Sequence, residues 1–110
     1  MASHEELACP PIAWPTIIFL LITLCVYSLP PLLTWHHPTL WTVPITAIST
    51  YASFTAMHEA AHRAVSAKYR WLNELVGQVT AIIVFQSPFK AFRYIHLEHH
   101  KYTNDPAKDP

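Results

Sequence analysis

The chain has 110 residues and no formal net charge at pH 7, but its charges are unevenly distributed. From Leu7 to Met57 there is no Asp, Glu, Lys or Arg, and all seven Lys and Arg residues follow this stretch. Such a distribution is typical of a membrane protein and gives no support to nucleic-acid binding, which requires a surplus of basic residues on one face. The single glycine argues against a Gly-rich phosphate-binding loop.

The first predicted element is a membrane-spanning helix at about residues 12–33. This segment is almost wholly apolar, and about 20 such residues are enough to cross the hydrocarbon core of a bilayer as a helix. Pro15 fits the first turn, where its missing N–H is not needed, while Pro30 and Pro31 are expected to end the span.

A second span is predicted at about residues 40–57. It is less apolar than the first, but it contains small residues of the kind that let membrane helices pack closely. These small residues are Ala47, Ser49, Ala52, Ser53 and Ala56. Because the segment continues without a helix breaker into a histidine cluster, we expect that cluster at the membrane exit of a long helix.

The basic residues indicate how this hairpin is oriented. Lys and Arg concentrate in short cytoplasmic loops, and here they follow the second span. We therefore expect an integral, multi-pass membrane protein with both ends of the hairpin in the cytoplasm. The polar turn between the spans, which contains His36 and His37, is expected on the opposite side.

Two shorter elements are predicted after the hairpin. Asn73 is a candidate N-cap, and the apolar stretch at 75–86 is too short for a third crossing, which favours a re-entrant or interfacial segment. A Ser-Pro pair then predicts the start of a helix over 88–103. The predicted fold is an all-α membrane protein: a two-span helical hairpin, a short re-entrant segment and a cytoplasmic helix that bears histidines, in one domain over residues 1–110.

Five histidines in two clusters are the candidate metal ligands. They are His58 and His62 in the first cluster, and His96, His99 and His100 in the second. Positions three and four apart share one face of a helix, so each cluster can present its rings together. Neutral imidazole is the commonest side-chain ligand for transition metals such as iron, zinc and copper. We expect both clusters on the cytoplasmic side, close to the lipid surface.

The first cluster also matches H-E-x-x-H, the pattern of zinc metalloproteases. In that interpretation His58 and His62 bind zinc, and Glu59 is the general base. A zinc protease has no need of the further histidines, however, so this hypothesis explains only part of the pattern. More histidines than one catalytic zinc can use favour two metal ions.

The order H-x-x-x-H and then H-x-x-H-H, after paired spans, resembles that of the membrane fatty acid desaturases. The similarity to bacterial members extends to Arg63, to residues 72–78 and 92–96, and to the Lys-Tyr-Thr-Asn-Asp-Pro sequence at 101–106. The resemblance covers most of residues 40–110.

This resemblance implies a non-haem enzyme with two iron ions, which uses O₂ to remove hydrogen from a lipid acyl chain. A separate protein of the ferredoxin or cytochrome b5 type would deliver electrons. O₂ activation needs a redox-active metal, which zinc is not. Related diiron lipid or carotenoid hydroxylases and ketolases share this chemistry and stay open as alternatives. The implied iron ligands are His58, His62, His96, His99 and His100.

The resemblance also implies a third histidine box after further membrane spans, and no such box occurs before Pro110. His4, His36 and His37 lack the spacing to supply it. We therefore expect these residues to be the N-terminal part of a longer enzyme or a truncated gene product. We expect the isolated chain to bind metal poorly and to be inactive.

Overall fold

The computed structural model describes residues 9–35 and 39–110, and within these residues the chain forms α-helices and no β-strand. The predicted all-α class is therefore confirmed. His4, His36 and His37 lie outside the described residues. The helices are α1 (Trp14–Leu33), α2 (Thr42–Ala61), α3 (Arg70–Phe85) and α4 (Phe89–Tyr102).

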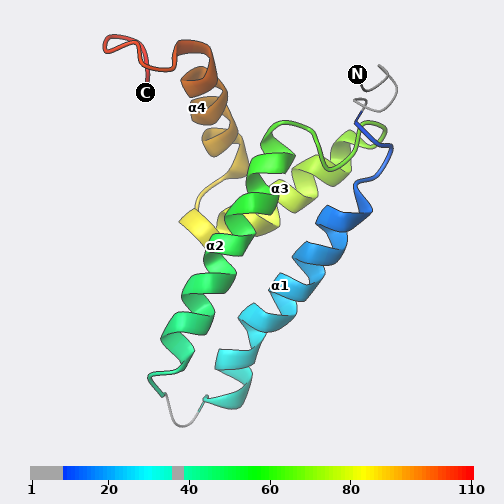
Figure 1. Ribbon diagram of the computed structural model, residues 1–110, viewed down its shortest axis with the longest axis vertical. Coiled ribbons are helices and arrows are strands. Elements are labelled where there is room, and N and C mark those ends of the chain that lie inside the picture. Colours follow the sequence, from blue (N-terminus) through cyan, green and yellow to red (C-terminus); the bar gives the residue numbers. More distant parts are fainter. Residues whose placement is uncertain (1–8, 36–38) are drawn as a thin grey trace, which may run out of the picture.

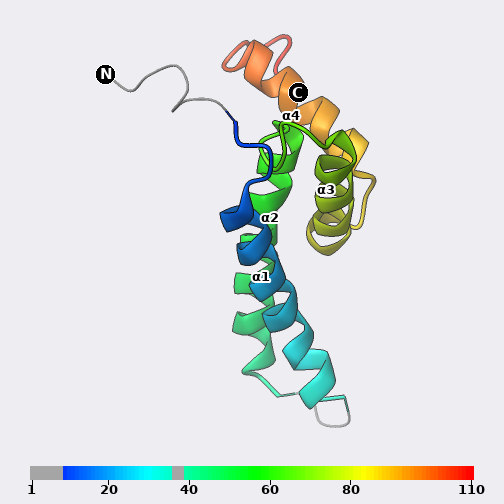
Figure 2. The ribbon, with the colours of Figure 1, turned by 90° about the vertical axis from the view of Figure 1, so that its right-hand side faces the viewer.

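Helix α2 lies at the centre of the arrangement. It runs antiparallel to α1 along most of its length (Figure 1), and α3 packs against it from another side (Figure 2). Of the small residues predicted to pack, Ser49, Ser53 and Ala56 are buried, whereas Ala47 and Ala52 are not. The two buried serine hydroxyls donate to carbonyls one turn earlier (2.8 and 2.9 Å), so their burial leaves no donor unpaired.

Helix α1 has the length and apolar composition to cross a bilayer. Among the single helices of the described residues, it alone meets both criteria. It continues through Pro30 and Pro31 to Leu33 instead of ending at them. Each proline loses one hydrogen bond to the carbonyl four residues earlier, and the helix ends two residues after Pro31. The N–H of Thr34 then closes the helix on the Pro30 carbonyl (3.0 Å).

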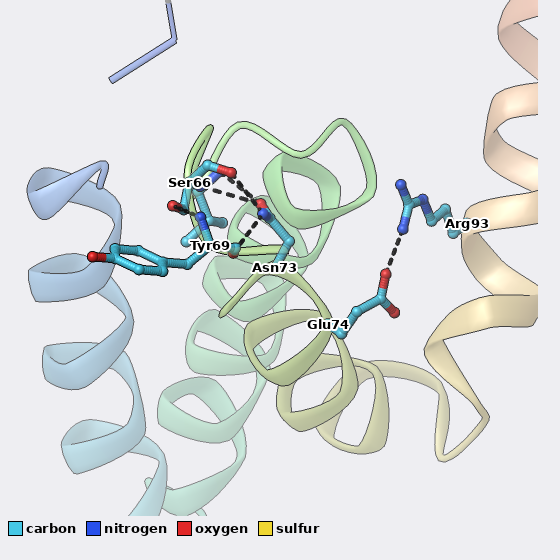
Figure 3. A network of polar contacts seen from close by, with 6 residues as sticks. Ser66, Tyr69, Asn73, Glu74 and Arg93 are labelled. Atoms are coloured by element: carbon cyan, nitrogen blue, oxygen red, sulfur yellow. Dashed lines mark hydrogen bonds and ion pairs between the residues drawn. The ribbon is translucent and has the colours of Figure 1, made fainter. Parts of the chain in front are cut away.

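The connection from α2 to α3 is held by the buried amide of Asn73 (Figure 3). Its Oδ1 accepts hydrogen bonds from the N–H groups of Val65 and Ser66 (both 3.2 Å). Its Nδ2 donates to the carbonyls of Ser66 (2.8 Å) and Tyr69 (3.3 Å). The prediction that Asn73 caps the helix is wrong, because α3 begins at Arg70 and Asn73 lies inside it. The amide instead ties the loop to α3.

Residues 9–13 lie along the same loop and tie α1 to it. The N–H of Ala13 donates to the carbonyl of Val65 (2.8 Å). In return, the N–H of Ala67 donates to the carbonyl of Pro10 (3.1 Å). The start of α1 and the end of α2 are therefore joined at the end of the molecule where the first histidine cluster lies.

Helix α3 begins earlier than the apolar stretch at 75–86 indicated. It runs from Arg70 to Phe85, so its first turns include the polar residues Arg70, Asn73 and Glu74. Its polar side chains have partners inside the fold: Asn73 bonds the preceding loop, and Glu74 forms an ion pair with Arg93 of α4 (2.6 Å; Figure 3). These tertiary contacts extend the helix beyond its apolar part.

Helix α4 leaves α3 at an angle of 90°. Gln86 adopts the left-handed conformation (φ 52°) and ends α3, and Pro88 stands at the N-cap of α4 without a side-chain hydrogen bond, so the predicted Ser cap does not form. Phe89 is buried directly against Gly77, where an added Cβ would lie 2.3 Å from the Phe89 ring. Only glycine permits this close approach, which fixes the bend.

Candidate metal centre

Histidines from the end of α2 and from α4 come together in one cluster. One ring nitrogen from each of His58, His62, His96 and His100 lies within 4.8 Å of all the others. The Nε2 atom of His96 lies 2.9 Å from Nε2 of His62 and 3.1 Å from Nε2 of His100. The structure therefore unites these four of the predicted ligands, which we call the histidine cluster.

Helical spacing accounts for each pair. The ring centroids of His58 and His62 are 4.7 Å apart, and those of His96 and His100 are 4.6 Å apart. His62 stands at the C-cap of α2, immediately after the buried Ala61. Because the first pair occupies the very end of α2, the second pair on α4 can meet it.

Phenylalanine rings support the histidine cluster from its apolar side. Phe92 stacks on His96, with ring centroids 5.2 Å apart and planes inclined by 12°. The ring centroid of Phe54 lies 6.4 Å from that of His58 and 6.0 Å from that of Phe92. The ring centroid of Phe85 lies 5.7 Å from that of Phe92. We call Phe54, Phe85 and Phe92 the aromatic group.

The surroundings favour the neutral form of two rings in this cluster, His62 and His96. Burial lowers the pKa of His62, and the neighbouring His58 and His100 lower it further. Burial and the adjacent histidines lower the pKa of His96 to about 4. Neutral imidazoles with converging nitrogens suit transition metals such as iron and zinc, whereas Mg²⁺ and Ca²⁺ prefer oxygen ligands. The residues present therefore fit a transition-metal ion.

His99 is the predicted ligand that lies apart from the histidine cluster. Its Nδ1 is 2.6 Å from Oδ1 of Asp109, and its ring centroid is 6.0 Å from that of His100. Adjacent residues of a helix point in directions about 100° apart, so His99 and His100 cannot share one face. The hydrogen bond from His99 holds the pKa of the Asp109 carboxyl below its usual range.

Glu59 faces α1 and is not part of the histidine cluster. Its Oε2 accepts a hydrogen bond from Oγ1 of Thr16 (2.5 Å). Beside this contact is a small cavity of about 230 Å³ between the two helices, to which Phe19 and Ala56 contribute. The general base of an H-E-x-x-H protease must reach the metal-bound water. Engaged with α1, Glu59 is poorly placed for that role.

Comparison with known proteins identifies the family. The family model described as "Fatty acid desaturase" matches residues 33–110, which contain both histidine clusters of the sequence. The chain belongs to the fatty acid desaturase family. The resemblance stated from the sequence motifs is therefore confirmed.

Desaturases are also among its relatives. An sn-1 oleoyl-lipid 12-desaturase of Synechocystis is 34% identical over 105 residues, which are 89% of this chain and 28% of the relative. One from Anabaena variabilis is 36% identical over 72 residues, 66% of this chain and 19% of the relative. A beta-carotene ketolase of Haematococcus lacustris is 30% identical over 57 residues, 52% of this chain and 18% of the relative. The chain thus spans less than a third of each relative's length. No solved structure matches the chain significantly.

Some residues that support the histidines were not predicted. Phe54 and Phe92 each precede a clustered histidine by one helical turn, so the spacing that paired the histidines could also have indicated them. Thr16 had no such signal, because its partner lies on another helix. Asp109 also had none, because α4 ends between it and His99.

Proposed function

We propose that this chain forms part of an O₂-dependent oxidoreductase that removes hydrogen from lipid acyl chains. The observation that carries the proposal is the histidine cluster formed between α2 and α4. It lies within the residues that match the fatty acid desaturase family. A shell of imidazole nitrogens suits the redox-active metal that such chemistry requires.

The proposed cofactor is a pair of non-haem iron ions, which supply O₂ activation when bound. The surroundings of His96 favour its neutral form and orient its ring. Burial lowers the pKa of His96, and Phe92 fixes the plane of its ring by stacking. His99 would bind through Nε2, since its Nδ1 faces Asp109. The proposed iron ligands are His58, His62, His96, His99 and His100.

We infer an integral, multi-pass membrane protein with spans at about 12–33 and 40–57, in a single desaturase-type domain. The length and composition of α1 support the first span. The 20 residues of α2, at about 1.5 Å per residue, are long enough for the second. The basic residues that follow α2 favour a cytoplasmic location for the histidines.

The segments after the hairpin are proposed to remain at the cytoplasmic face. Helix α3 has 16 residues, about 24 Å at the usual rise, which is shorter than the hydrocarbon core of a bilayer. The 90° bend between α3 and α4 supports a re-entrant segment at 75–86 that leads into a histidine-bearing helix at 88–103.

An apolar groove between α2 and α3 is the proposed path of the acyl chain. It has a volume of about 380 Å³ and is lined by residues that include Tyr51, Phe54, Val84 and Phe85. Phe54 and Phe85 also belong to the aromatic group, which contacts the histidine cluster. A chain in the groove would therefore approach the cluster along a surface that excludes water. Relatives named sn-1 oleoyl-lipid 12-desaturase make an oleoyl lipid the first substrate to test.

The electrons are proposed to come from a separate protein of the ferredoxin or cytochrome b5 type. Reduction of O₂ to water takes more electrons than formation of one double bond releases, so an external donor is needed. A related diiron hydroxylase or ketolase is the second candidate, because a beta-carotene ketolase is among the relatives. The same histidines would serve either reaction, and the product distinguishes them.

The zinc protease hypothesis is less well supported, and a single variant separates it from the oxidoreductase. Glu59→Gln removes the general base that a protease needs, whereas iron binding by the histidines does not require it. We expect the protein purified from membranes to contain iron in preference to zinc. We expect His96→Ala to lose this iron and Glu59→Gln to keep it.

Because the isolated chain is expected to be inactive, activity is tested in a protein of the relatives' full length that contains these residues. The membranes contain an oleoyl lipid, O₂ and a reduced ferredoxin. The expected product carries an additional double bond, and its formation depends on His96 but not on Glu59. A hydroxylated product would favour the second candidate. Bound zinc together with peptide cleavage that disappears in Glu59→Gln would contradict the proposal.

A further inference from the structure

The chain after α4 turns back toward the last turn of that helix. Helix α4 ends just before Asn104, which adopts the left-handed conformation (φ 65°). The carbonyl of Asp105 then accepts hydrogen bonds from the N–H groups of Lys108 (3.2 Å) and Asp109 (3.0 Å). This turn, which we call the 104–109 turn, returns Asp109 to the side of α4 that bears His99.

Both carboxylate oxygens of Asp109 have partners. Oδ1 lies 2.6 Å from Nδ1 of His99, and Oδ2 accepts a hydrogen bond from the N–H of Asn104 (3.1 Å). The Asp109 side chain is only 22% exposed. Lys108 adds a second anchor, because its Nζ lies 5.5 Å from the centre of the Tyr102 ring. The backbone of the turn therefore aims the carboxylate at one particular ring nitrogen.

This contact distinguishes His99 from the other histidines of the two sequence clusters. Within the described residues, His99 is the only one of them whose ring meets a carboxylate, while the others contact one another and phenylalanine rings. A carboxylate that accepts a hydrogen bond from Nδ1–H fixes the tautomer whose Nε2 carries the free lone pair. The same hydrogen bond makes Nε2 a stronger donor to a metal.

We propose that Asp109 is a positioning residue that holds His99 as the Nδ1–H tautomer and presents its Nε2 to a metal ion. This inference rests on the proposed function, because it takes His99 as a ligand. Rotation of the imidazole by half a turn would place Cδ2 where Nδ1 now lies and break the hydrogen bond to Asp109. The carboxylate therefore orients the ring before a metal arrives.

A purely structural role for Asp109, in closing the 104–109 turn, makes different predictions. Lys108→Ala weakens the same turn without touching His99, because it removes only the contact with Tyr102. Glu98→Gln removes a negative charge next to His99 in the sequence, and Glu98 interacts with Lys101 (4.0 Å) instead of His99. These two variants are matched controls for the turn and for the charge.

The first experiment is ¹⁵N NMR of the histidine rings in the metal-free protein, at a pH where the rings are neutral. We expect the His99 signals of the Nδ1–H tautomer in the wild type, in Lys108→Ala and in Glu98→Gln. In Asp109→Ala we expect the tautomer mixture of a free imidazole, and in Asp109→Glu a partial return to Nδ1–H. An unchanged His99 tautomer in Asp109→Ala would overturn the proposal.

The second experiment measures Co²⁺ affinity by absorption spectroscopy. Because loss of a partner that orients a metal ligand lowers affinity by about 10–100-fold, we expect Asp109→Ala to weaken binding by about tenfold or more. The two controls should retain wild-type affinity. In a His99→Ala background, Asp109→Ala should have no further effect, since the residue acts through His99. An equal loss in that background, or in Lys108→Ala, would contradict the proposal.

The outcomes separate this inference from the proposed function. If His96→Ala abolishes Co²⁺ binding while Asp109→Ala leaves it intact, the metal site at the histidine cluster is supported and the positioning role of Asp109 is contradicted. If the wild type and His96→Ala bind Co²⁺ equally weakly, the metal site of the proposed function is contradicted too.

Discussion

The two halves of the histidine cluster are held in place in different ways. The half on α2 is built into the core: Met57 and Ala60, on either side of His58, are fully buried. The loop that follows is tied to α3 by Asn73 and to residues 9–13 by backbone hydrogen bonds. This half has contacts on several sides.

The half on α4 depends on far fewer contacts. Phe89 is its only buried residue, and the Arg93–Glu74 ion pair adds a second link to α3. The aromatic group gives further contact near His96. The α2 half is thus a fixed frame, while the angle of α4 determines whether the second pair of histidines meets the first. Substitutions on the two sides should therefore affect stability and metal binding in different proportions.

The largest expected effect comes from Phe89→Ala, which removes the buried anchor of α4. Loss of a buried phenylalanine side chain costs about 4 kcal/mol in the free energy of unfolding. We expect this loss in thermal unfolding in detergent, together with loss of Co²⁺ binding. Ile95→Ala is the matched control on the same helix, since Ile95 is 52% exposed and should change stability little. An equal effect of both variants would show that Phe89 is not the anchor.

Asn73→Leu tests the frame on the α2 side. It leaves the N–H groups of Val65 and Ser66 and two carbonyls without their partner, and we expect a loss of about 3 kcal/mol. Because none of the hydrogen bonds of this amide reaches α4, Co²⁺ affinity of the folded fraction should change less than in Phe89→Ala. Unfolding monitored by circular dichroism measures the first quantity, and Co²⁺ titration the second. Wild-type stability in Asn73→Leu would contradict the inference that the hydrogen bonds of Asn73 hold the α2 half in place.

Gly77→Ala tests the angle of α4 directly. The new Cβ would meet the Phe89 ring at 2.3 Å, so the ring and its helix must move. We expect a cost of about 2 kcal/mol in stability, as in other overpacked sites. Metal affinity should fall further than this cost alone explains, because the second histidine pair is displaced. Adding Phe89→Leu to Gly77→Ala makes room for the new Cβ. Recovery of Co²⁺ binding in this double variant would show that displacement of α4 causes the loss of affinity.

The smallest expected effect is a gain in stability from Gln86→Gly. Gln86 has a positive φ of 52° at the end of α3, a conformation that glycine adopts without steric cost. We expect the free energy of unfolding to rise by about 0.5 kcal/mol, because relief of the left-handed strain exceeds the entropy cost of glycine. Co²⁺ affinity should be unchanged, because the bend is preserved. Gln86→Val should have the opposite effect on stability. A loss of metal affinity in Gln86→Gly would show that Gln86 itself holds the angle of α4.

The helical class and the histidine pairing were predictable because both depend on local spacing. His58 and His62 share a face in any helix, and so do His96 and His100. The meeting of these pairs depends instead on the turn between α3 and α4, where Gly77 accommodates Phe89. No pattern in the sequence encodes that angle.

Polar residues with long-range partners account for the predictions that failed. Asn73 has the chemistry of an N-cap, but its amide is used to bond a preceding loop that buries it. The polar start of α3 concealed the helix, since Glu74 has its partner Arg93 on α4. His99 could be predicted as a candidate ligand, but its direction depends on Asp109, beyond the end of the helix. Local propensity does not contain such tertiary contacts.

The hydrogen bond between Thr16 and Glu59 restricts the position of α1 along α2. Apolar attraction between helices is non-directional, so a shift by one turn replaces apolar contacts with similar ones. A single polar pair across the interface is not interchangeable, because any shift leaves a carboxylate in an apolar setting without its donor. The contact therefore favours one register of α1 against α2. Because His58 is the residue beside Glu59, the same contact determines where His58 lies relative to α1.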